Sequence, residues 1–262
     1  MILADIAARP LAPYWFRGKG RLFNLLCPNW GTKEATLFGY TVRLDLSDLI
    51  QRNVYLGTYE PEESSLIRRF LRSGITFVDV GANVGYYSLM AAAAAGPSGR
   101  VVAIEPNPDL CEGLEETIRN NRIRNMILEQ AAVGKETGWA DLFVPTHPGN
   151  NTATLIPNGG GSPIRVRVIT LDEYLEQQQI ATVDFLKIDV EGFEDKVLEG
   201  ARCALRAKRI RAVLCEFNGT WLRARGATPR DCFDLIRSFG LRPVQQPSKH
   251  DLEFGNVLFF AD

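Results

Sequence analysis

The stretch FVDVGANVGYYS, residues 77 to 88, decides how the rest of this sequence is interpreted. It begins as an apolar run typical of a buried parallel strand, with one acid, Asp79, inside the run. Gly81 and Gly85 then interrupt the run just before a helical pattern, which predicts a tight turn from strand to helix. Open α/β sheets bind ligands at the carboxyl ends of their strands, so this stretch predicts both a fold class and a site.

Short apolar runs and helical patterns alternate from this stretch to the carboxyl terminus. The predicted strands span residues 76–82, 100–106, 126–133, 183–190, 209–217 and 256–261. The predicted helices span residues 84–95, 108–121, 170–179, 193–206 and 229–239. This alternation is typical of an α/β, Rossmann-like fold with a doubly wound, mostly parallel sheet.

Two segments fall outside the alternation. Residues 1–75 contain a strand pair around TLFGYTVRLDL and a helix at 62–72, and we expect them to form an N-terminal cap on a single compact domain, residues 76–262. Residues 145–163 are rich in Gly, Pro and Asn and lie between two strand-like arms, WADLFV and IRVRVITL. The pattern predicts an inserted hairpin that carries a mobile lid.

Composition narrows the class of protein. With 262 residues and a formal net charge of -1, the chain can form one sizeable core and has no overall field to recruit nucleic acid. Its five cysteines form no C-x-x-C pair, which argues against a zinc site or a disulfide framework and favours a cytoplasmic location. No apolar run reaches the about 18 residues of a membrane-spanning helix. Whether the chain forms a homo-oligomer is left open.

The spacing of the glycines indicates which kinds of ligand the turn could bind. A dinucleotide site needs G-x-G-x-x-G and a phosphate loop needs G-x-x-x-x-G-K-[ST], and neither pattern occurs here. Glu105 ends the next predicted strand about 20 residues further on, where such folds bind ribose hydroxyls. Together with Asp79, it favours a nucleoside that carries positive charge, S-adenosylmethionine. Alternatively, the glycines could be needed only for the backbone geometry of the turn, with no ligand bound there.

Several stretches besides the glycine turn share a pattern with one enzyme family. In chain order the motifs are GTYEPEE (57–63), FVDVGANVGYYS (77–88), AIEPNP (103–108), AAVG (131–134), LKIDVEGFEDKVLEGA (186–201) and VLCEFN (213–218). On these motifs the sequence resembles the FkbM-type family of S-adenosylmethionine-dependent methyltransferases. The resemblance implies a class I methyltransferase fold of seven strands, the last antiparallel, and O-methylation of a hydroxyl group of a sugar or secondary metabolite.

The resemblance also implies which residues bind the cofactor. It places the methionine end at Asp79, Gly81, Asn83 and Gly85, the ribose at Glu105, and the adenine edge at Gln130 and Ala131. The adjoining Ala82, Pro106 and Asn107 are included in the predicted cofactor-binding set.

The motif LKIDVEG supplies the candidate catalytic residues. Lys187, Asp189 and Glu191 recur at every second position, so they share one side as their strand ends. Methyl transfer to a hydroxyl needs an aligned acceptor and a base, which could be Asp189 or Glu191. Alternatively, Asp189 and Glu216 could hold Mg²⁺ or Ca²⁺, which would lower the pKa of the acceptor hydroxyl. Lys187 could instead neutralise Asp79 or Asp189 as a buried ion pair.

Four further residues are candidates for contact with the acceptor. Tyr59 and Glu60 precede the helix predicted at 62–72, where they could equally be ordinary turn and helix-start residues. His147 and Asn151 lie in the predicted lid. His147 could enter the site when the lid closes, or it could stay a solvated loop residue.

Two other functions share parts of this pattern. A nucleic-acid methyltransferase could use the arginine-rich stretches RCALRAKRIRA and WLRARGATPR, although arginines at helix ends commonly stay solvated or cap carbonyl groups. A non-catalytic S-adenosylmethionine-binding protein would keep Asp79 and Glu105 but would not need Asp189 and Glu191. A nicotinamide-dependent oxidoreductase is disfavoured by the glycine spacing. The expected partner is therefore a small-molecule or glycan hydroxyl acceptor.

Overall fold

The computed structural model describes residues 31–144, 153–157 and 163–261 of the chain. The first 30 residues, most of the predicted lid, and with it His147 and Asn151, lie outside the described residues. Within the described ranges, no helix is long and apolar enough to cross a membrane. The division into a cap and a domain between residues 75 and 76 stays a prediction.

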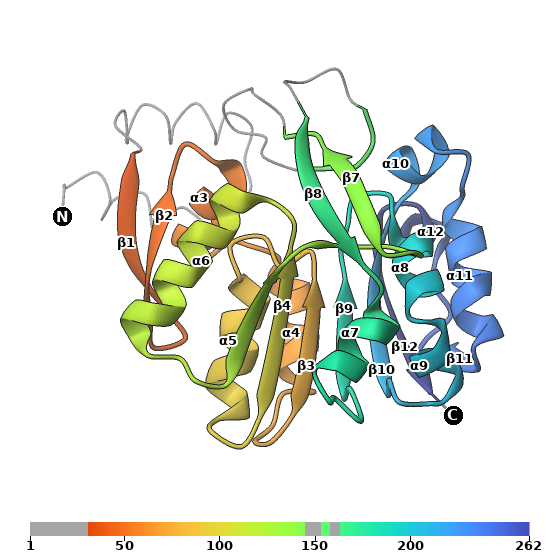
Figure 1. Cartoon of the computed structure of the whole chain (residues 1–262), viewed down its shortest axis with the longest axis horizontal. Helices are drawn as coiled ribbons and strands as arrows, with labels where there is room; N and C mark the ends of the chain where they lie inside the picture. The colour runs from red at the N-terminus through yellow and green to blue at the C-terminus, as the bar shows by residue number, and fades with distance from the viewer. Residues whose placement is uncertain (1–30, 145–152, 158–162, 262) are drawn as a thin grey trace.

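A seven-stranded sheet forms the centre of the molecule (Figure 1). In the order β11-β12-β10-β9-β3-β4-β5, its strands are Leu241–Pro243, Gly255–Ala261, Ala212–Asn218, Phe185–Ile188, Thr76–Val80, Arg100–Glu105 and Met126–Gln130. The five strands from β10 to β5 run parallel, whereas β12 is antiparallel to both of its neighbours. The predicted doubly wound sheet with an antiparallel last strand is therefore confirmed.

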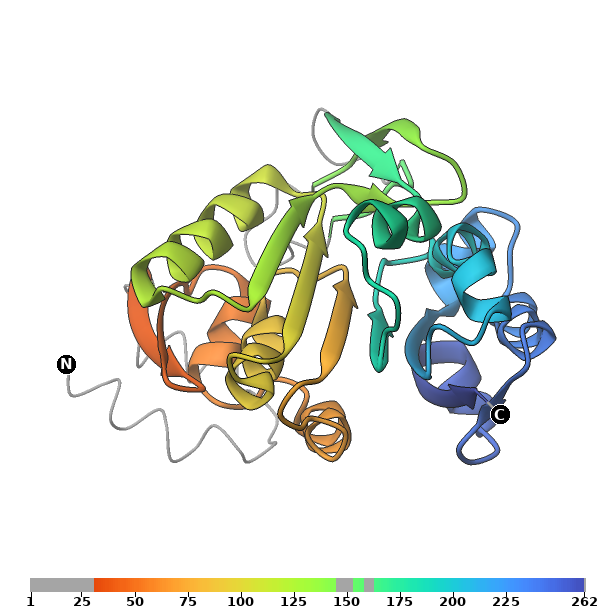
Figure 2. The same ribbon diagram turned by 60° about the horizontal axis from the view of Figure 1, so that its bottom comes forward.

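Helices cover both faces of this sheet, as Figures 1 and 2 show together. On one face, residues such as Val78 and Val80 pack against α7 (Leu171–Gln177), α8 (Glu194–Gly200), α9 (Arg202–Arg206) and α11 (Pro229–Ser238). On the other face, Phe77 and Phe185 pack against α4 (Pro61–Arg68) and α5 (Tyr86–Ala95). Neighbouring residues of a strand alternate between faces, so Asp79 shares the face of Phe77.

The residues before β3 form the predicted strand pair and helix. β1 (Thr32–Leu37) and β2 (Tyr40–Asp45) pair antiparallel, and α3 (Leu49–Tyr55) follows, capped by the side chain of Asp48. α4 is the helix predicted at 62–72, but it ends at Arg68. Side chains of the β1-β2 hairpin pack against the α5 side of the core. The hairpin also contacts α6 (Pro108–Asn121), which begins at the N-cap Asn107.

One predicted strand, 126–133, is divided between two sheets. The N–H of Ala131 bonds to the carbonyl oxygen of Glu129 over 3.1 Å, so the backbone bends after β5. The next two residues form β6 (Ala132–Val133), which pairs with β8 (Ile164–Ile169), and β8 pairs antiparallel with β7 (Gly138–Leu142). The hairpin arms predicted on either side of the lid are thus β7 and β8.

Several elements differ from the sequence predictions for local reasons. The helix predicted at 193–206 is divided into α8 and α9 at Ala201, where φ is -104° and ψ is 8°. β11 was not predicted, because it has three residues and contains Pro243, which cannot donate to a sheet. Three short helices, α3, α10 (Gly219–Ala224) and α12 (Lys249–Phe254), were also missed.

Candidate active site

The turn between β3 and α5 is closed so tightly that it requires glycine. The N–H of Gly81 donates to the carbonyl oxygen of Ile104 on β4 over 2.9 Å. Gly81 has a φ of +84°, and a Cβ at this position would lie 1.8 Å from the carbonyl oxygen of Asp189. A Cβ at Gly85 would lie 2.5 Å from Cδ1 of Leu114. Packing against β9 and α6 therefore demands these glycines, whatever ligand the turn binds.

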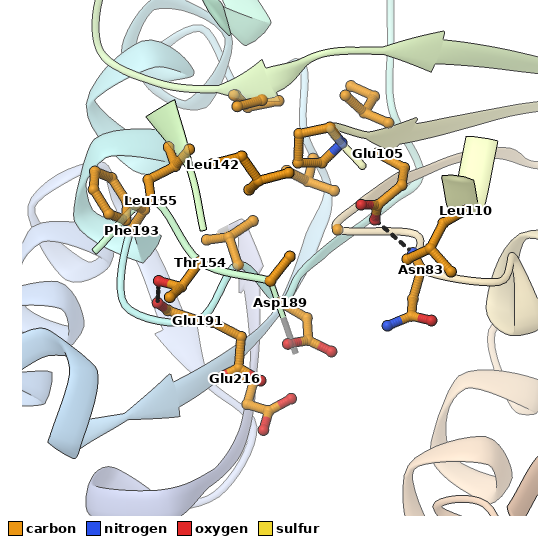
Figure 3. A pocket seen from close by; sticks show the side chains of 18 of the residues that line it. Asn83, Glu105, Leu110, Leu142, Thr154, Leu155, Asp189, Glu191, Phe193 and Glu216 are labelled. Carbon is orange, nitrogen blue, oxygen red and sulfur yellow. Dashed lines mark hydrogen bonds between the residues drawn. The ribbon is translucent and has the colours of Figure 1, made fainter. Parts of the chain in front are cut away.

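Glu105, at the end of β4, accepts hydrogen bonds from the backbone just before two helices, α5 and α6. Its Oε2 accepts from the N–H of Asn83 over 2.8 Å, and its Oε1 accepts from the N–H of Asn107 over 2.9 Å. Figure 3 shows the first of these bonds beside the cavity. Burial raises the pKa of Glu105 to about 7, although both hydrogen bonds act against that rise. The carboxylate therefore fixes the position of the glycine turn relative to the start of α6.

A buried cation lies beneath the cavity between two acids. The Nζ of Lys187 is 2.8 Å from Oδ2 of Asp189 and 5.0 Å from the ring centroid of Tyr87. Burial alone would lower the pKa of Lys187, but the charges of Asp189 and Asp79 outweigh it and raise that pKa. Asp79 is the register partner of Lys187 on β3, and its Oδ2 accepts from Ser88 over 2.7 Å. Its Oδ1 is buried without a partner among the described residues.

A cavity opens above this ion pair, at the carboxyl ends of β3, β4, β9 and β10 (Figure 3). The apolar part of its wall includes Leu110, Leu142, Leu155 and Phe193. The acidic residues in the wall are Glu60, Glu105, Asp189, Glu191 and Glu216. No lysine, arginine or histidine lines the cavity in the part of the chain that the structure describes. The cavity therefore combines an apolar wall with an acidic rim.

The acidic residues of this rim raise one another's pKa values. The charge of Asp189, followed by burial, raises the pKa of Glu216 to about 10. Burial, followed by Asp189, raises the pKa of Glu191 to about 7. The pKa of Glu60 is raised by the same two causes, and its Oε2 accepts from the hydroxyl of Tyr87 over 2.6 Å. At neutral pH this rim therefore retains protons that isolated carboxyl groups would release.

Glu191 lies in a turn with unusual backbone geometry. Its φ is +49° and that of Gly192 is +96°, so two consecutive residues are left-handed. The carboxylate accepts from Nδ2 of Asn218 over 2.8 Å, and the backbone carbonyl accepts from the hydroxyl of Thr154 over 3.0 Å. Thr154 belongs to residues 153–157, and it also pairs with Phe143 next to β7. The turn is therefore held from two sides of the cavity.

Comparison with known proteins identifies the family. Residues 79–243, more than half of the chain, match the model of the methyltransferase FkbM domain. The chain belongs to the FkbM methyltransferase family. The match includes the glycine turn, Glu105, the Lys187 pair and all of β10, so it covers most of the cavity described above.

Individual FkbM relatives match over part of their length. The chain is 31% identical over 175 residues to 31-O-demethyl-FK506 methyltransferase FkbM of Streptomyces tacrolimicus, covering 56% of this chain and 66% of the relative. It is 27% identical over 159 residues to hexuronic acid methyltransferase AglP of Haloferax volcanii, covering 60% and 59%. A crystal structure of methyltransferase FkbM from Methylobacillus flagellatus KT is 18% identical, with coverages of 81% and 55% and a TM-score of 0.49. The chain thus spans less than two thirds of these curated relatives.

The cavity of this FkbM family member contains many of the residues predicted from sequence. They are Tyr59, Glu60, Gly81, Asn83, Glu105, Pro106, Ala131, Asp189, Glu191 and Glu216. Asp79, Ala82, Asn107 and Lys187 are buried outside the wall. Gly85 caps α5, and Gln130 is exposed, so Ala131 is the member of the predicted adenine edge that lines the cavity.

Sequence reasoning missed the apolar wall and the partners of Glu191. Phe193 follows Glu191 by two residues, and its position immediately after LKIDVEG was a usable signal. Leu142, Thr154 and Leu155 come from the hairpin and the segment beyond it. Nothing in their local sequence links them to β9, because the link depends on where β6 leaves the main sheet.

The carboxylates considered as metal ligands are not arranged as a metal centre. Among the described residues, no group of three or more His, Cys, Asp or Glu side chains could hold a metal ion. Asp189 already pairs with Lys187, and the pKa of Glu216 is raised to about 10. Because Asp189 is already paired with Lys187, the described residues give no support to a divalent cation held by Asp189 and Glu216.

Glu194 gives a prediction about stability and pH. It is buried, its Oε1 accepts from the N–H of Gly192 over 2.9 Å, and burial raises its pKa to about 8. Because the folded-state pKa exceeds the unfolded one, its contribution is complete below the unfolded pKa and is lost as the pH rises through about 8. We expect Glu194→Gln, which keeps the acceptor oxygen, to lose less unfolding free energy than the wild type between about pH 5 and pH 8. Urea unfolding across that range measures both slopes, and parallel slopes would contradict the prediction.

Proposed function

We propose that this member of the FkbM family is an S-adenosylmethionine-dependent methyltransferase that acts on a hydroxyl group of a sugar or secondary metabolite. The observation that carries the proposal is the single cavity that joins the glycine turn and Glu105 to the acidic rim. One end suits a charged nucleoside and the other suits an acceptor from which a proton is removed. The names of the two relatives, 31-O-demethyl-FK506 methyltransferase and hexuronic acid methyltransferase, support this reaction class.

The residues at the first end fit the cofactor. The glycine turn lines the cavity at Gly81 and Asn83, and Glu105 lies at the strand end where ribose is bound in such folds. The unpartnered Oδ1 of Asp79 is a buried acceptor close to the same turn. Ala131 and Leu142 supply an apolar part of the wall suited to a base. When bound, the cofactor supplies a methyl group on a positively charged sulfur.

At the acceptor end of the cavity, one acid provides a fixed charge and another removes the proton. Asp189 is held beside the ammonium of Lys187, so it serves as a charge anchored in the rim. Glu191 has a pKa raised to about 7, and its position in the rim is fixed by Asn218. A base works best when its pKa is near the operating pH. We therefore assign Glu191, rather than Asp189, to the removal of the acceptor proton.

The charge of the wall limits the class of acceptor. Five carboxyl groups and no basic side chain of the described residues line the cavity, so an acceptor carboxylate or phosphate would find no positive partner in this wall. Uncharged polyhydroxylated acceptors, or acceptors with an amino group, suit it better. The nucleic-acid alternative is weakened by the same feature, because phosphate contacts need lysine or arginine.

The proposal is tested by calorimetric titration with S-adenosylhomocysteine, with and without magnesium. We expect the wild type to bind and Glu105→Ala to bind at least about 100-fold more weakly, because the variant loses both hydrogen bonds that set the turn. Glu112→Ala, an exposed position on α6, is the matched control and should bind as the wild type does. Failure of the wild type to bind in either buffer would refute the proposed cofactor.

A further inference from the structure

Two of the three arginines in the stretch WLRARGATPR, Arg223 and Arg225, have different surroundings. Arg223 lies on α10 with its side chain 48% exposed, where it pairs with Glu253. Arg225 is the C-cap residue of the same helix, and its side chain is only 18% exposed. Burial of a guanidinium is costly unless its hydrogen bonds are satisfied, so the partners of Arg225 indicate what it does.

Arg225 is directed at the turn that follows β9. Its Nε and Nη2 both donate to the carbonyl oxygen of Gly192, over 2.9 and 2.7 Å. Its guanidinium carbon lies 4.3 Å from the ring centroid of Phe193 and its Nη2 pairs with Asp195 at the start of α8. One side chain thus holds the backbone at Gly192, the ring at Phe193 and the helix beyond. Lysine could not reproduce this planar, forked contact.

Two other residues of the α10 region contact the same turn. Asn218, the N-cap of α10, donates to Oε2 of Glu191. Trp221 packs so closely on Gly192 that a Cβ there would lie 2.5 Å from the Cβ of Trp221. Asn218, Trp221 and Arg225 are separated by three and then four residues, the spacing that places side chains on one face of a helix. The face of α10 formed by these three residues therefore covers the turn from Glu191 to Phe193.

This turn needs outside support because its own backbone is unfavourable. Glu191 is not glycine, and its φ of +49° costs about 1–2 kcal/mol relative to ordinary backbone. The turn is also where the carboxylate of Glu191 and the ring of Phe193 enter the cavity wall. We propose that Arg225 is a positioning residue, which acts through Gly192 to hold Glu191 and Phe193 at the acceptor side of the cavity. The inference rests on the proposed function, which places the acceptor on that side.

Four variants separate this role from a general effect on folding. Arg225→Gln removes the fork and the charge, Arg225→Lys keeps the charge, and Asp195→Asn removes the ion-pair partner but leaves both bonds to Gly192. Arg223→Gln on the same helix is the matched control. For each variant, S-adenosylhomocysteine titration gives the affinity and the number of competent sites, and methyl transfer to a neutral polyhydroxylated acceptor gives kcat per competent site. Hydrogen exchange of the peptide around residues 189–198 reports on the turn directly.

We expect Arg225→Gln to keep cofactor affinity while kcat per competent site falls about 10- to 100-fold, the size of effect that a misplaced catalytic group produces. Exchange of the 189–198 peptide should rise in this variant, Arg225→Lys should recover part of the loss, and Asp195→Asn and Arg223→Gln should stay close to the wild type. A purely structural arginine would lower the number of competent sites and leave kcat per site unchanged, which would overturn the proposal. Unchanged exchange in both Arg225 variants would overturn it as well. If the wild type bound no S-adenosylhomocysteine, the proposed function would fail while exchange still tested the role of Arg225.

Discussion

Replacing Gly81 by alanine is expected to abolish binding of S-adenosylhomocysteine and to destabilise the fold by about 3 kcal/mol or more. A Cβ at this position would lie 1.8 Å from the backbone oxygen of Asp189, which cannot move away without displacing the end of β9. The left-handed φ of +84° adds about 1–2 kcal/mol of backbone cost for any residue with a Cβ, and overpacking adds about 1–3 kcal/mol. Calorimetric titration and urea unfolding measure the two effects.

Gly39 supplies the matched control for this prediction. Its φ is +92°, close to that of Gly81, but no atom lies within 4 Å of the position its Cβ would take. Gly39→Ala therefore incurs the backbone cost without the clash and should leave cofactor binding intact. If the two alanine variants lost equal stability and both bound S-adenosylhomocysteine, the contact with Asp189 would not be the reason for glycine at position 81.

Replacing Lys187 by methionine should cost about 3–5 kcal/mol of unfolding free energy at neutral pH, because it leaves buried acids without their cation. The lysine side chain is 3% exposed and 2.8 Å from Asp189, and its charge also lowers the pKa of Asp79. Without that charge the pKa of Asp79 rises further, so the acid takes up a proton more readily as the pH falls. The loss should therefore be larger at about pH 8 than at about pH 5.

Lys196 is the matched control, since it also forms ion pairs but lies closer to solvent. Its side chain is 33% exposed and its Nζ is 3.1 Å from Asp195 and from Glu199. Exposed pairs contribute about 0–1 kcal/mol, so Lys196→Met should be nearly neutral. Denaturant unfolding of both variants at two pH values checks the prediction. A Lys187 loss that is independent of pH would mean that methionine disturbs packing alone.

The sequence predicted the sheet because its strands are buried on both faces and therefore read as continuous apolar runs. The helices with clear caps, such as α6 after Asn107 and α11 after Thr228, were also placed within a few residues. The short elements were missed. β11 and α10 have too few residues for a periodic signal, and tertiary contacts rather than local propensity hold them in place.

In the candidate site, too, some residues could be predicted from the sequence and others could not. Asp79, Glu105 and the LKIDVEG acids were found because charges in apolar strands stand out in a sequence. The sequence proposed Lys187 as a partner of Asp79 or Asp189, but it did not predict the bonds from Asn83 to Glu105 and from Asn218 to Glu191, which join residues distant in the chain. Lys187 lies 2.8 Å from Asp189, which is two residues further along the same segment, and its position opposite Asp79 follows from the register of β3 and β9. Arg225 was the hardest to predict, since an arginine in a basic stretch usually faces water.

Thr154 has a consequence for engineering. Residues 153–157 include Leu155 in the cavity wall, and Thr154 connects this segment both to Phe143 beside β7 and to the backbone of Glu191. Ala153, Thr154 and Leu155 of this segment line the cavity, so replacing the segment would change this part of the wall. The pairing with Phe143 uses backbone atoms alone, so a graft needs threonine at this position only for the hydroxyl bond to the carbonyl oxygen of Glu191, and under the proposed function the new side chains around it are expected to alter acceptor choice.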